Sequence, residues 1–161
     1  MLSIHPTAVI SKLADIEASV RGTHIVIGAR TVIDSFVKIK PAGGTGDLSI
    51  GDDCVINSGT VIYTGNGVRI GSAVLIAANC TLAASNHAFS ERGSRIRDQG
   101  FAKSKGGIVI EDDVWLGANV VVLDGATIRQ GAVVGAGSVV IGELGPYSVN
   151  YGSPARSHST R

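Results

Sequence analysis

One histidine, His87, lies where the chain departs from an otherwise regular pattern. It ends the segment A-S-N-H and is followed at once by an insertion, residues 88–107, that holds five basic and two acidic side chains. An imidazole can take up and release a proton near neutral pH, so proton transfer is the chemistry that His87 offers. A single histidine is more often structural, and its position beside the long insertion is what makes this one a candidate. Loops of this length inside a compact domain are usually functional or disordered.

The segments that must position His87 follow a six-residue rule. Over residues 110–139, five units in succession open with Ile, Leu or Val and place a small or β-branched residue four positions later. Extended over the chain, the rule gives eighteen units, and the run of complete triples breaks after Arg21, Gly44, Gly67 and His87. A fixed short period predicts a stacked solenoid, in which each unit buries its apolar face only against its neighbours.

Three units make one coil with three flat sides, so the triples predict that every insertion leaves the stack from the same corner. Residues 22–26 and 45–49 are alternatively shortened units, which would move that corner. The expected fold is all-β, with about six three-sided coils. We expect the repeats and the loop at residues 88–107 to occupy residues 1–145, and a short tail to occupy residues 146–161.

The composition fits a narrow aliphatic core and excludes several classes of protein. Of the 161 residues, 44% are apolar, only 4% are aromatic and 22 are glycine, as expected for a chain that turns every few residues. A net charge of +1 gives no reason to expect a nucleic-acid or membrane partner. No apolar run approaches membrane-spanning length, and no basic and apolar leader is recognised, so a cytoplasmic location is expected.

The cysteines and histidines do not suggest a metal site. Cys54 and Cys80 fall at the inward small-residue position of their units, where a buried, reduced thiol is expected. The four histidines are far apart in the sequence, whereas a zinc site of histidines needs several that cluster.

Four segments resemble the hexapeptide-repeat acyltransferases. They are residues 70–87, which end in S-N-H, I-E-D-D-V-W-L-G-A-N-V-V-V-L at residues 110–123, V-V-G-A-G-S-V-V at residues 133–140 and Y-G-S-P-A-R at residues 151–156. The similarity is greatest to galactoside and maltose O-acetyltransferases and to the sugar acetyltransferases of polysaccharide and O-antigen synthesis. The resemblance implies a left-handed parallel β-helix. The handedness rests on the resemblance alone, because the general rule for parallel crossovers favours the opposite hand.

The resemblance also implies acetyl-CoA as co-substrate and no metal. The histidine before the loop, His87, would act as general base and take a proton from an acceptor hydroxyl or amine as that atom attacks the thioester. Asn57 matches an asparagine of the acceptor site in the galactoside enzyme, although turns favour asparagine at corners in any case. Trp115 matches a tryptophan near the thioester end of the cofactor and is expected to be a contact residue.

By the same resemblance, four small residues would line a groove for the pantetheine arm of CoA: Gly117, Ala118, Ala136 and Gly137. Each of them is also a plausible corner or packing residue. The phosphates of CoA require cations, and Arg156, Lys103 and Lys105 are candidates. Exposed basic residues usually have no specific role, so these three assignments rest on charge alone.

The resemblance further implies a homotrimer with its sites between neighbouring subunits. In the sequence, apolar residues such as Val9, Val61, Leu75 and Val121 are expected to point outward from the flat sides. The expected function is acetyl transfer to a hydroxyl of a saccharide. Two alternatives are N-acetylation of a nucleotide-linked amino sugar, which the same base would serve, and a non-catalytic β-helical scaffold.

Overall fold

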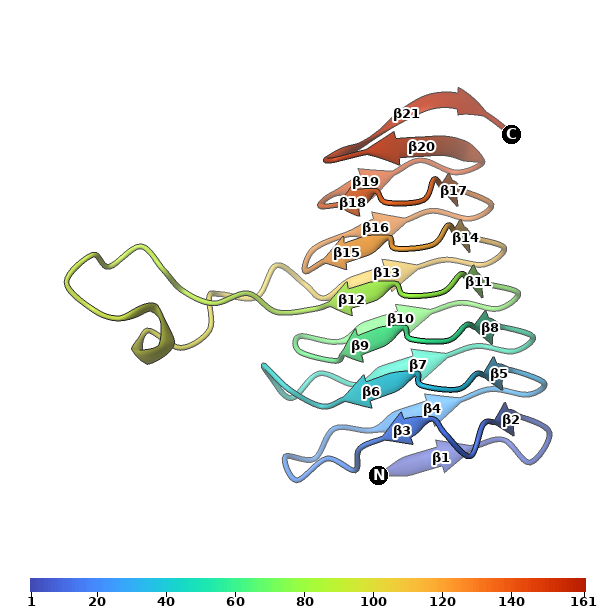
Figure 1. Cartoon of the computed structure of the whole chain (residues 1–161), viewed down its shortest axis with the longest axis horizontal. Coiled ribbons are helices and arrows are strands. Elements are labelled where there is room, and N and C mark those ends of the chain that lie inside the picture. Colours follow the sequence, from blue (N-terminus) through green and yellow to red (C-terminus); the bar gives the residue numbers. More distant parts are fainter.

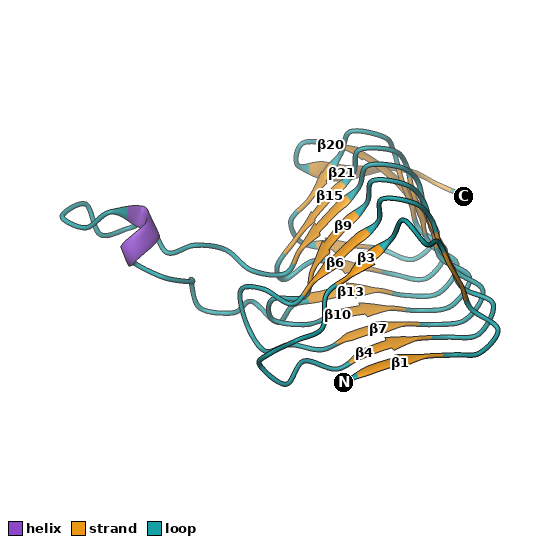
Figure 2. Ribbon diagram, turned by 60° about the horizontal axis from the view of Figure 1, so that its bottom comes forward, coloured by secondary structure: helices purple, strands orange, loops and turns teal.

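The chain folds into a three-sided prism of stacked coils, from which one long loop projects (Figures 1 and 2). The structure is a computed structural model, and it describes all residues, 1–161. Each coil contributes one short strand to each of three sheets, whose strands are parallel except for the last. Residues 88–107 form the projecting loop, hereafter the arm, and its one 3-10 turn, η1, spans Ile96–Asp98.

The strands of each sheet come from successive coils. The seven-stranded sheet contains β1 (Leu2–Ile4), β4 (Ile25–Ile27), β7 (Leu48–Ile50), β10 (Val68–Ile70), β13 (Ile108–Ile110), β16 (Thr127–Ile128) and β19 (Glu143–Leu144). The eight-stranded sheet contains β2 (Val9–Ile10), β5 (Val32–Ile33), β8 (Val55–Ile56), β11 (Leu75–Ile76), β14 (Trp115–Leu116), β17 (Val133–Val134), β20 (Ser148–Gly152) and β21 (Ala155–Thr160). The six-stranded sheet contains β3 (Asp15–Ile16), β6 (Lys38–Lys40), β9 (Val61–Tyr63), β12 (Thr81–Ala83), β15 (Val121–Leu123) and β18 (Val139–Val140).

The six-residue rule is confirmed by the strand register. In the seven-stranded sheet, the unit openers Ile27, Ile50, Ile70 and Ile110 pair in one continuous column. The openers point inward, and from the second coil to the sixth they are all buried. They belong to a core cluster of 30 residues, to which nearly every coil contributes. Stacking in register therefore satisfies backbone hydrogen bonds and buries the apolar column at once.

The breaks in the pattern all lie at one corner, as the triples predicted. Each insertion connects the six-stranded sheet to the seven-stranded sheet, at the turns β3 to β4, β6 to β7, β9 to β10 and β12 to β13. The strands on both sides of residues 22–26 and 45–49 stay in register, which excludes shortened units there. We call this the loop corner, and it includes residues 84–107 and 124–126. The groove corner, between the eight-stranded and six-stranded sheets, comprises residues 57–60, 77–80, 117–120 and 135–138.

The glycines that directly follow openers are required by close stacking. A Cβ on Gly51 would lie 2.6 Å from the carbonyl carbon and oxygen of Gly71 in the next coil. The left-handed backbone of these turns is instead adopted two residues later, by Asp53 and Ala73, with φ of 58° and 57°. The sequence therefore marks the turns correctly, but the physical reason is the close contact between coils.

The two ends of the prism differ. In the first coil, Ile4 is 37% exposed, and Ile10 and Ile16 are only half-buried. At the other end, the residues expected to be a tail form a hairpin, in which β20 continues the eight-stranded sheet and β21 pairs with it antiparallel. The buried side chain of Asn150 donates to the carbonyl oxygen of Val133, 3.1 Å away, beneath this hairpin. No helix in the structure has the length and hydropathy needed to span a bilayer.

Candidate functional site

His87 lies outside the prism, at the base of the arm. Its ring is exposed and stacks on Phe101, with ring centroids 4.8 Å apart. Its Nδ1 lies 3.2 Å from the carbonyl oxygen of Gly100. A carbonyl oxygen can only accept, so Nδ1 carries the proton of the neutral ring and Nε2 keeps a free lone pair. This tautomer and this exposure suit a group that removes a proton from a bound molecule.

Two clefts open on either side of the His87 ring. The first, here the N-side cleft, has a volume of about 310 Å³ and is lined by Ala42, Gly43, Tyr63, Ala83, Ser85, His87 and Phe101. The second, here the C-side cleft, has a volume of about 380 Å³ and is lined by Asn86, His87, Phe89, Ala102, Lys105, Leu123, Asp124 and Ile141. His87 is thus shared by a cleft over the earlier coils and a cleft over the later coils.

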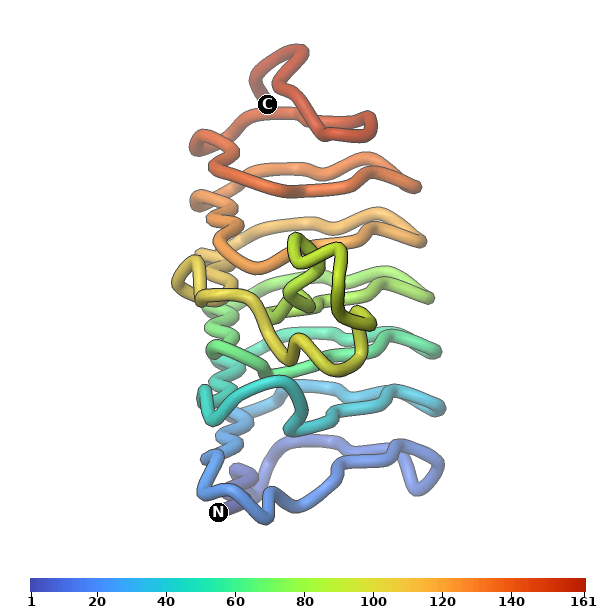
Figure 3. The backbone as a smooth tube through the Cα atoms, turned by 90° about the vertical axis from the view of Figure 1, so that its left-hand side faces the viewer, coloured from blue at the N-terminus to red at the C-terminus, as the bar shows by residue number.

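The two legs of the arm are held to each other at its base. Figure 3 looks along the arm, which projects toward the viewer in front of the middle coils. The amide of Ala88 donates to the carbonyl of Gly100 at 3.0 Å, and the amide of Ala102 donates to the carbonyl of Asn86 at 2.7 Å. These bonds flank the antiparallel bridge between His87 and Phe101. His87 therefore directly precedes the outgoing leg of the arm, and the returning leg, residues 100–107, carries both groups that fix its ring.

The end of the returning leg is hydrogen-bonded to a buried carboxylate of the prism, that of Asp124. This side chain is 3% exposed and lies in the loop corner directly after β15. It accepts hydrogen bonds from the amides of Lys105 and Gly107, both at 2.9 Å, and from the Asn66 side chain at 3.1 Å. Three donors around one carboxylate compensate for much of its lost hydration.

Five of the predicted cofactor residues lie at or beside the groove corner, on the fifth and sixth coils: Trp115, Gly117, Ala118, Ala136 and Gly137. Trp115 is 51% exposed on the outer face of β14. Gly117 and Ala118 lie directly beneath Ala136 and Gly137, and the Gly137 amide donates to the Ala118 carbonyl at 2.9 Å. A Cβ on Gly117 would lie 2.6 Å from the backbone nitrogen of Ala136, so this position requires glycine. The result is a track of small side chains beside an exposed indole.

Asn57 lies at the same groove corner, in the third coil. Its side-chain nitrogen donates to the carbonyl of Ile76 at 2.8 Å, which ties it to the next coil. It lines neither cleft at His87 of its own chain. Within one chain, the predicted residues are therefore divided between two corners of the prism, with His87 at one and with Asn57, Trp115 and the small-residue track at the other.

The three basic candidates also lie apart. Lys105 lines the C-side cleft together with His87. Lys103 is exposed on the returning leg of the arm. Arg156 lies on β21, next to the sixth coil, and its guanidinium donates to the carbonyl of Ala155 at 3.0 Å. The structure therefore brings only Lys105 to the neighbourhood of His87.

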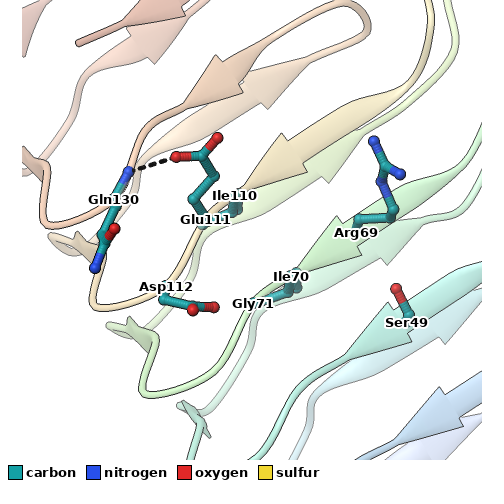
Figure 4. Close-up of a pocket in the computed structure, with 8 residues that line it drawn as sticks. All are labelled: Ser49, Arg69, Ile70, Gly71, Ile110, Glu111, Asp112 and Gln130. Atoms are coloured by element: carbon teal, nitrogen blue, oxygen red, sulfur yellow. Dashed lines mark hydrogen bonds between the residues drawn. The ribbon is translucent and has the colours of Figure 1, made fainter. Parts of the chain in front are cut away.

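Another hollow of the surface, of about 420 Å³, lies on a different face and includes none of the predicted residues (Figure 4). It is lined by polar groups on the seven-stranded sheet, among them Arg69, Glu111 and Asp112. Glu111 accepts from the Arg129 guanidinium and from the Gln130 amide, both at 2.8 Å. The hydrogen bond from Arg129, followed by that from the Gln130 amide, lowers the pKa of Glu111. These carboxylates are occupied in holding adjacent coils together.

The two cysteines lie in the core, as expected. Cys54 and Cys80 are both fully buried, and neither forms a disulfide. Burial raises the pKa of both thiols, so they stay protonated and unreactive. No cluster of three or more His, Cys, Asp or Glu side chains in the chain has the arrangement needed to hold a metal ion.

Three residues of the site were missed in the sequence: Tyr63, Phe101 and Asp124. Tyr63 and Phe101 are half-exposed aromatic side chains in a chain with few of them, and that scarcity was a usable signal. Asp124 occupies a register position at which the neighbouring coils carry Thr64 and Ala84, both buried. An acidic residue at a position that is otherwise small and buried was the signal there.

Comparison with known sequences and structures gives consistent relatives. A family described as bacterial transferase hexapeptide (six repeats) matches residues 107–142, and the hexapeptide repeat of succinyl-transferase matches residues 47–84. A probable acetyltransferase of Mycobacterium tuberculosis is 38% identical over 111 residues, which cover 69% of this chain and 36% of that protein. The galactoside O-acetyltransferase of Escherichia coli is 36% identical over 110 residues, which cover 68% of this chain and 52% of that protein.

The chain thus spans between about a third and a half of the length of these two relatives. Among solved structures, a point mutant of AntD, an N-acyltransferase from Bacillus cereus, matches with a TM-score of 0.82 and 26% identity. The match covers 99% of this chain and 83% of AntD, which was solved with dTDP-4-amino-4,6-dideoxyglucose and coenzyme A. Superposition over the whole length requires the same winding, so the coils are left-handed. Its repeats, its coil geometry and these matches make the chain a left-handed parallel β-helix of hexapeptide repeats that is similar to the hexapeptide-repeat acyltransferases.

Proposed function

We propose that the protein is an acetyl-CoA-dependent acetyltransferase that acetylates a hydroxyl of a saccharide, with His87 as general base. The observation that carries this proposal is the free Nε2 of an exposed imidazole whose Nδ1 is fixed by the Gly100 carbonyl. Nε2 takes the proton of the acceptor hydroxyl as its oxygen attacks the thioester carbonyl. The tetrahedral intermediate then expels the CoA thiolate, which takes up the proton and leaves as free thiol.

The co-substrate fits the groove corner. Gly117, Ala118, Ala136 and Gly137 leave room for an extended pantetheine arm, and Trp115 offers an apolar face beside it. Arg156, on the C-terminal hairpin, would bind a phosphate of CoA. Lys105 and Lys103 are the basic groups nearest to the base of the arm. Coenzyme A bound to AntD supports the same type of co-substrate here.

The division of residues between two corners supports a homotrimer. The loop corner and the groove corner flank the six-stranded sheet, so three copies with this sheet toward a common axis would bring His87 of one copy to the groove corner of the next. The outer face of that sheet carries Val61, Thr81, Val121 and Val139 in the third to sixth coils. At the equivalent positions, the seven-stranded sheet carries Ser49, Arg69, Val109 and Thr127.

The acceptor fits the N-side cleft. Tyr63 and Phe101 are the aromatic residues of its lining, and Ser85 and His87 provide polar side chains. Apolar walls with a few converging polar groups are typical of small-molecule sites, and this volume is at the lower end of their range. Asn57 would reach an acceptor only across the interface with a neighbouring copy. A cytoplasmic location fits the compartment in which acetyl-CoA is available.

A second candidate reaction is N-acetylation of a nucleotide-linked amino sugar. The observation that favours it is the amino-sugar nucleotide bound to AntD, whose fold matches over nearly the whole of this chain. The same base would remove a proton from the attacking amine. Parallel assays with hydroxyl and amino acceptors, followed by mass spectrometry of the product, distinguish an ester from an amide.

The proposal is tested by the release of free thiol from acetyl-CoA in the presence of a panel of sugars and sugar nucleotides. Replacement of His87 with Ala should lower kcat at least about 100-fold, because a positioned base contributes that much or more. The melting temperature should stay unchanged, because the His87 side chain is exposed. The equivalent change at His24, which is exposed at another insertion, is the control and should leave kcat unchanged.

Normal turnover by the His87→Ala protein would refute the assignment of the base. The scaffold alternative is tested separately by titration with CoA, since a ligand of the native state must raise the melting temperature. No shift at millimolar CoA would favour a scaffold that does not catalyse.

A further inference from the structure

Among the buried side chains of the chain, Asp124 is the one that carries a charge. The others are apolar, or are Thr, Ser and Asn. A buried carboxylate is costly unless hydrogen-bond donors surround it, so its presence at this position calls for an explanation. The corresponding positions of the two preceding coils hold Thr64 and Ala84, so the prism itself has no need of a carboxylate there.

The partners of Asp124 show what it holds. Its Oδ2 accepts from the Lys105 amide and its Oδ1 from the Gly107 amide, and both amides belong to the returning leg of the arm. The third donor, the side chain of Asn66, comes from the third coil and reaches Oδ2. The Asp124 side chain therefore binds the end of the arm through two backbone amides, and the Asn66 side chain holds the carboxylate through a third hydrogen bond.

The same leg determines the orientation of His87. It contains Gly100, whose carbonyl binds Nδ1, and Phe101, on which the ring stacks. Three residues separate Phe101 from Lys105, where the clamp begins. Asp124 also lines the C-side cleft together with His87 and Lys105. A shift of the returning leg would therefore move both groups that aim the imidazole.

We propose that Asp124 is a positioning residue, which clamps the returning leg of the arm and thereby holds His87 in its catalytic orientation. The inference rests on the proposed function of His87 as general base. Asparagine has nearly the same shape as aspartate, but its amide nitrogen would replace one acceptor with a donor that faces other donors. The Asp124→Asn protein should thus keep its prism and lose the fixed position of the leg.

The test is a double-mutant cycle of Asp124→Asn and His87→Ala, measured by thiol release. Alone, Asp124→Asn should lower kcat by roughly 10- to 100-fold, because displacement of a catalytic group by about 1 Å has effects of that size. The fold change in kcat should exceed the fold change in the KM for acetyl-CoA, since a positioning defect acts mainly on the chemical step. In the His87→Ala background, the same substitution should change the residual rate less than about twofold.

Two outcomes of the cycle would overturn the proposal. One is full kcat in the Asp124→Asn protein. The other is an equal fold loss with and without His87, which would show that Asp124 acts independently of the imidazole. Asp52→Asn is the matched control, because Asp52 also accepts a backbone amide, that of Ala29 at 2.7 Å, but at the corner remote from the arm. It should leave kcat unchanged.

A second measurement does not depend on activity. In the Asp124→Asn protein, hydrogen exchange should accelerate at least about tenfold at the amides of Lys105, Gly107 and Ala102, and stay unchanged in β11. The milder variant Asn66→Ala should show the same pattern with a smaller increase. Unchanged exchange at Ala102 would overturn the clamp even if no acceptor is found. Absence of turnover in the wild-type protein alone would count against the proposed function instead.

Discussion

The prism and the arm satisfy their backbone hydrogen bonds in different ways. In the prism, each strand bonds to the coil before and the coil after it, and the side chains beneath are buried. In the arm, residues 89–98 are all exposed, and the main-chain bonds are confined to its base and to a few turns near its tip. The prism thus provides stability, and a few contacts at the base of the arm provide geometry. Substitutions in the two regions should separate these properties.

The largest effect is expected in the core of the prism. Ile56 is fully buried in the third coil, and Ile10 occupies the same register column in the half-buried first coil. Ile56→Ala should lower the free energy of unfolding by about 2–5 kcal/mol, the usual loss for a buried aliphatic side chain. Ile10→Ala should cost less than about half as much. Urea denaturation of both proteins tests this, and equal losses would show that the first coil is packed as firmly as the third.

A smaller effect, on binding alone, is expected at the two aromatic residues that flank the site. Trp115→Ala should raise the KM for acetyl-CoA about tenfold and leave the KM for the acceptor unchanged, because the exposed indole lies on β14, directly before the groove corner. Tyr63→Ala should do the reverse, because Tyr63 lines the N-side cleft. Steady-state kinetics with each substrate varied in turn provide the measurement. Loss of both affinities in one variant would mean that the clefts are not divided between the two substrates.

The smallest effect is expected at the tip of the arm. The Gln99 side chain donates to the carbonyls of Glu91 and Ser94, at 2.9 and 3.0 Å, and accepts from the Glu91 amide at 3.1 Å. Gln99→Ala should loosen the tip and shift the melting temperature by less than about 2 °C, since no prism contact is lost. Calorimetry and proteolysis between residues 91 and 98 are the tests. A large drop in melting temperature would show that the arm contributes to the stability of the prism.

The fold could be predicted almost completely from the sequence, because the same spacing of inward-pointing residues recurs in every repeat unit. The inward position of Ile27, Ile50, Ile70 and Ile110 follows from spacing alone, and stacking in register leaves no other place for them. The breaks in the pattern located the arm and the corner from which it leaves. The close contact between Gly51 and Gly71 was not foreseen, because it depends on the distance between coils.

The site could be predicted only in part. The position of His87 beside an insertion was visible, but its fixation by Gly100 and Phe101 depends on the return path of an arm without any period. The clamp at Asp124 joins residues far apart in the sequence for the same reason. That Asn57 and Trp115 lie at a different corner from His87 follows from which sides of the coil they occupy. The roles assigned to Asn57, Trp115 and the basic residues remain predictions.

The confinement of every insertion to the loop corner has a consequence for how such a molecule can change. Segments of very different length leave the stack there, and the strands above and below them remain paired without a shift. Additional residues can therefore be inserted at the loop corner without a change in the stacked strands. The turns at the other two corners have nearly constant length. Grafting a foreign peptide between Thr45 and Gly46 would exploit that freedom, and the arm can change in length or sequence in the same way while the strands stay paired.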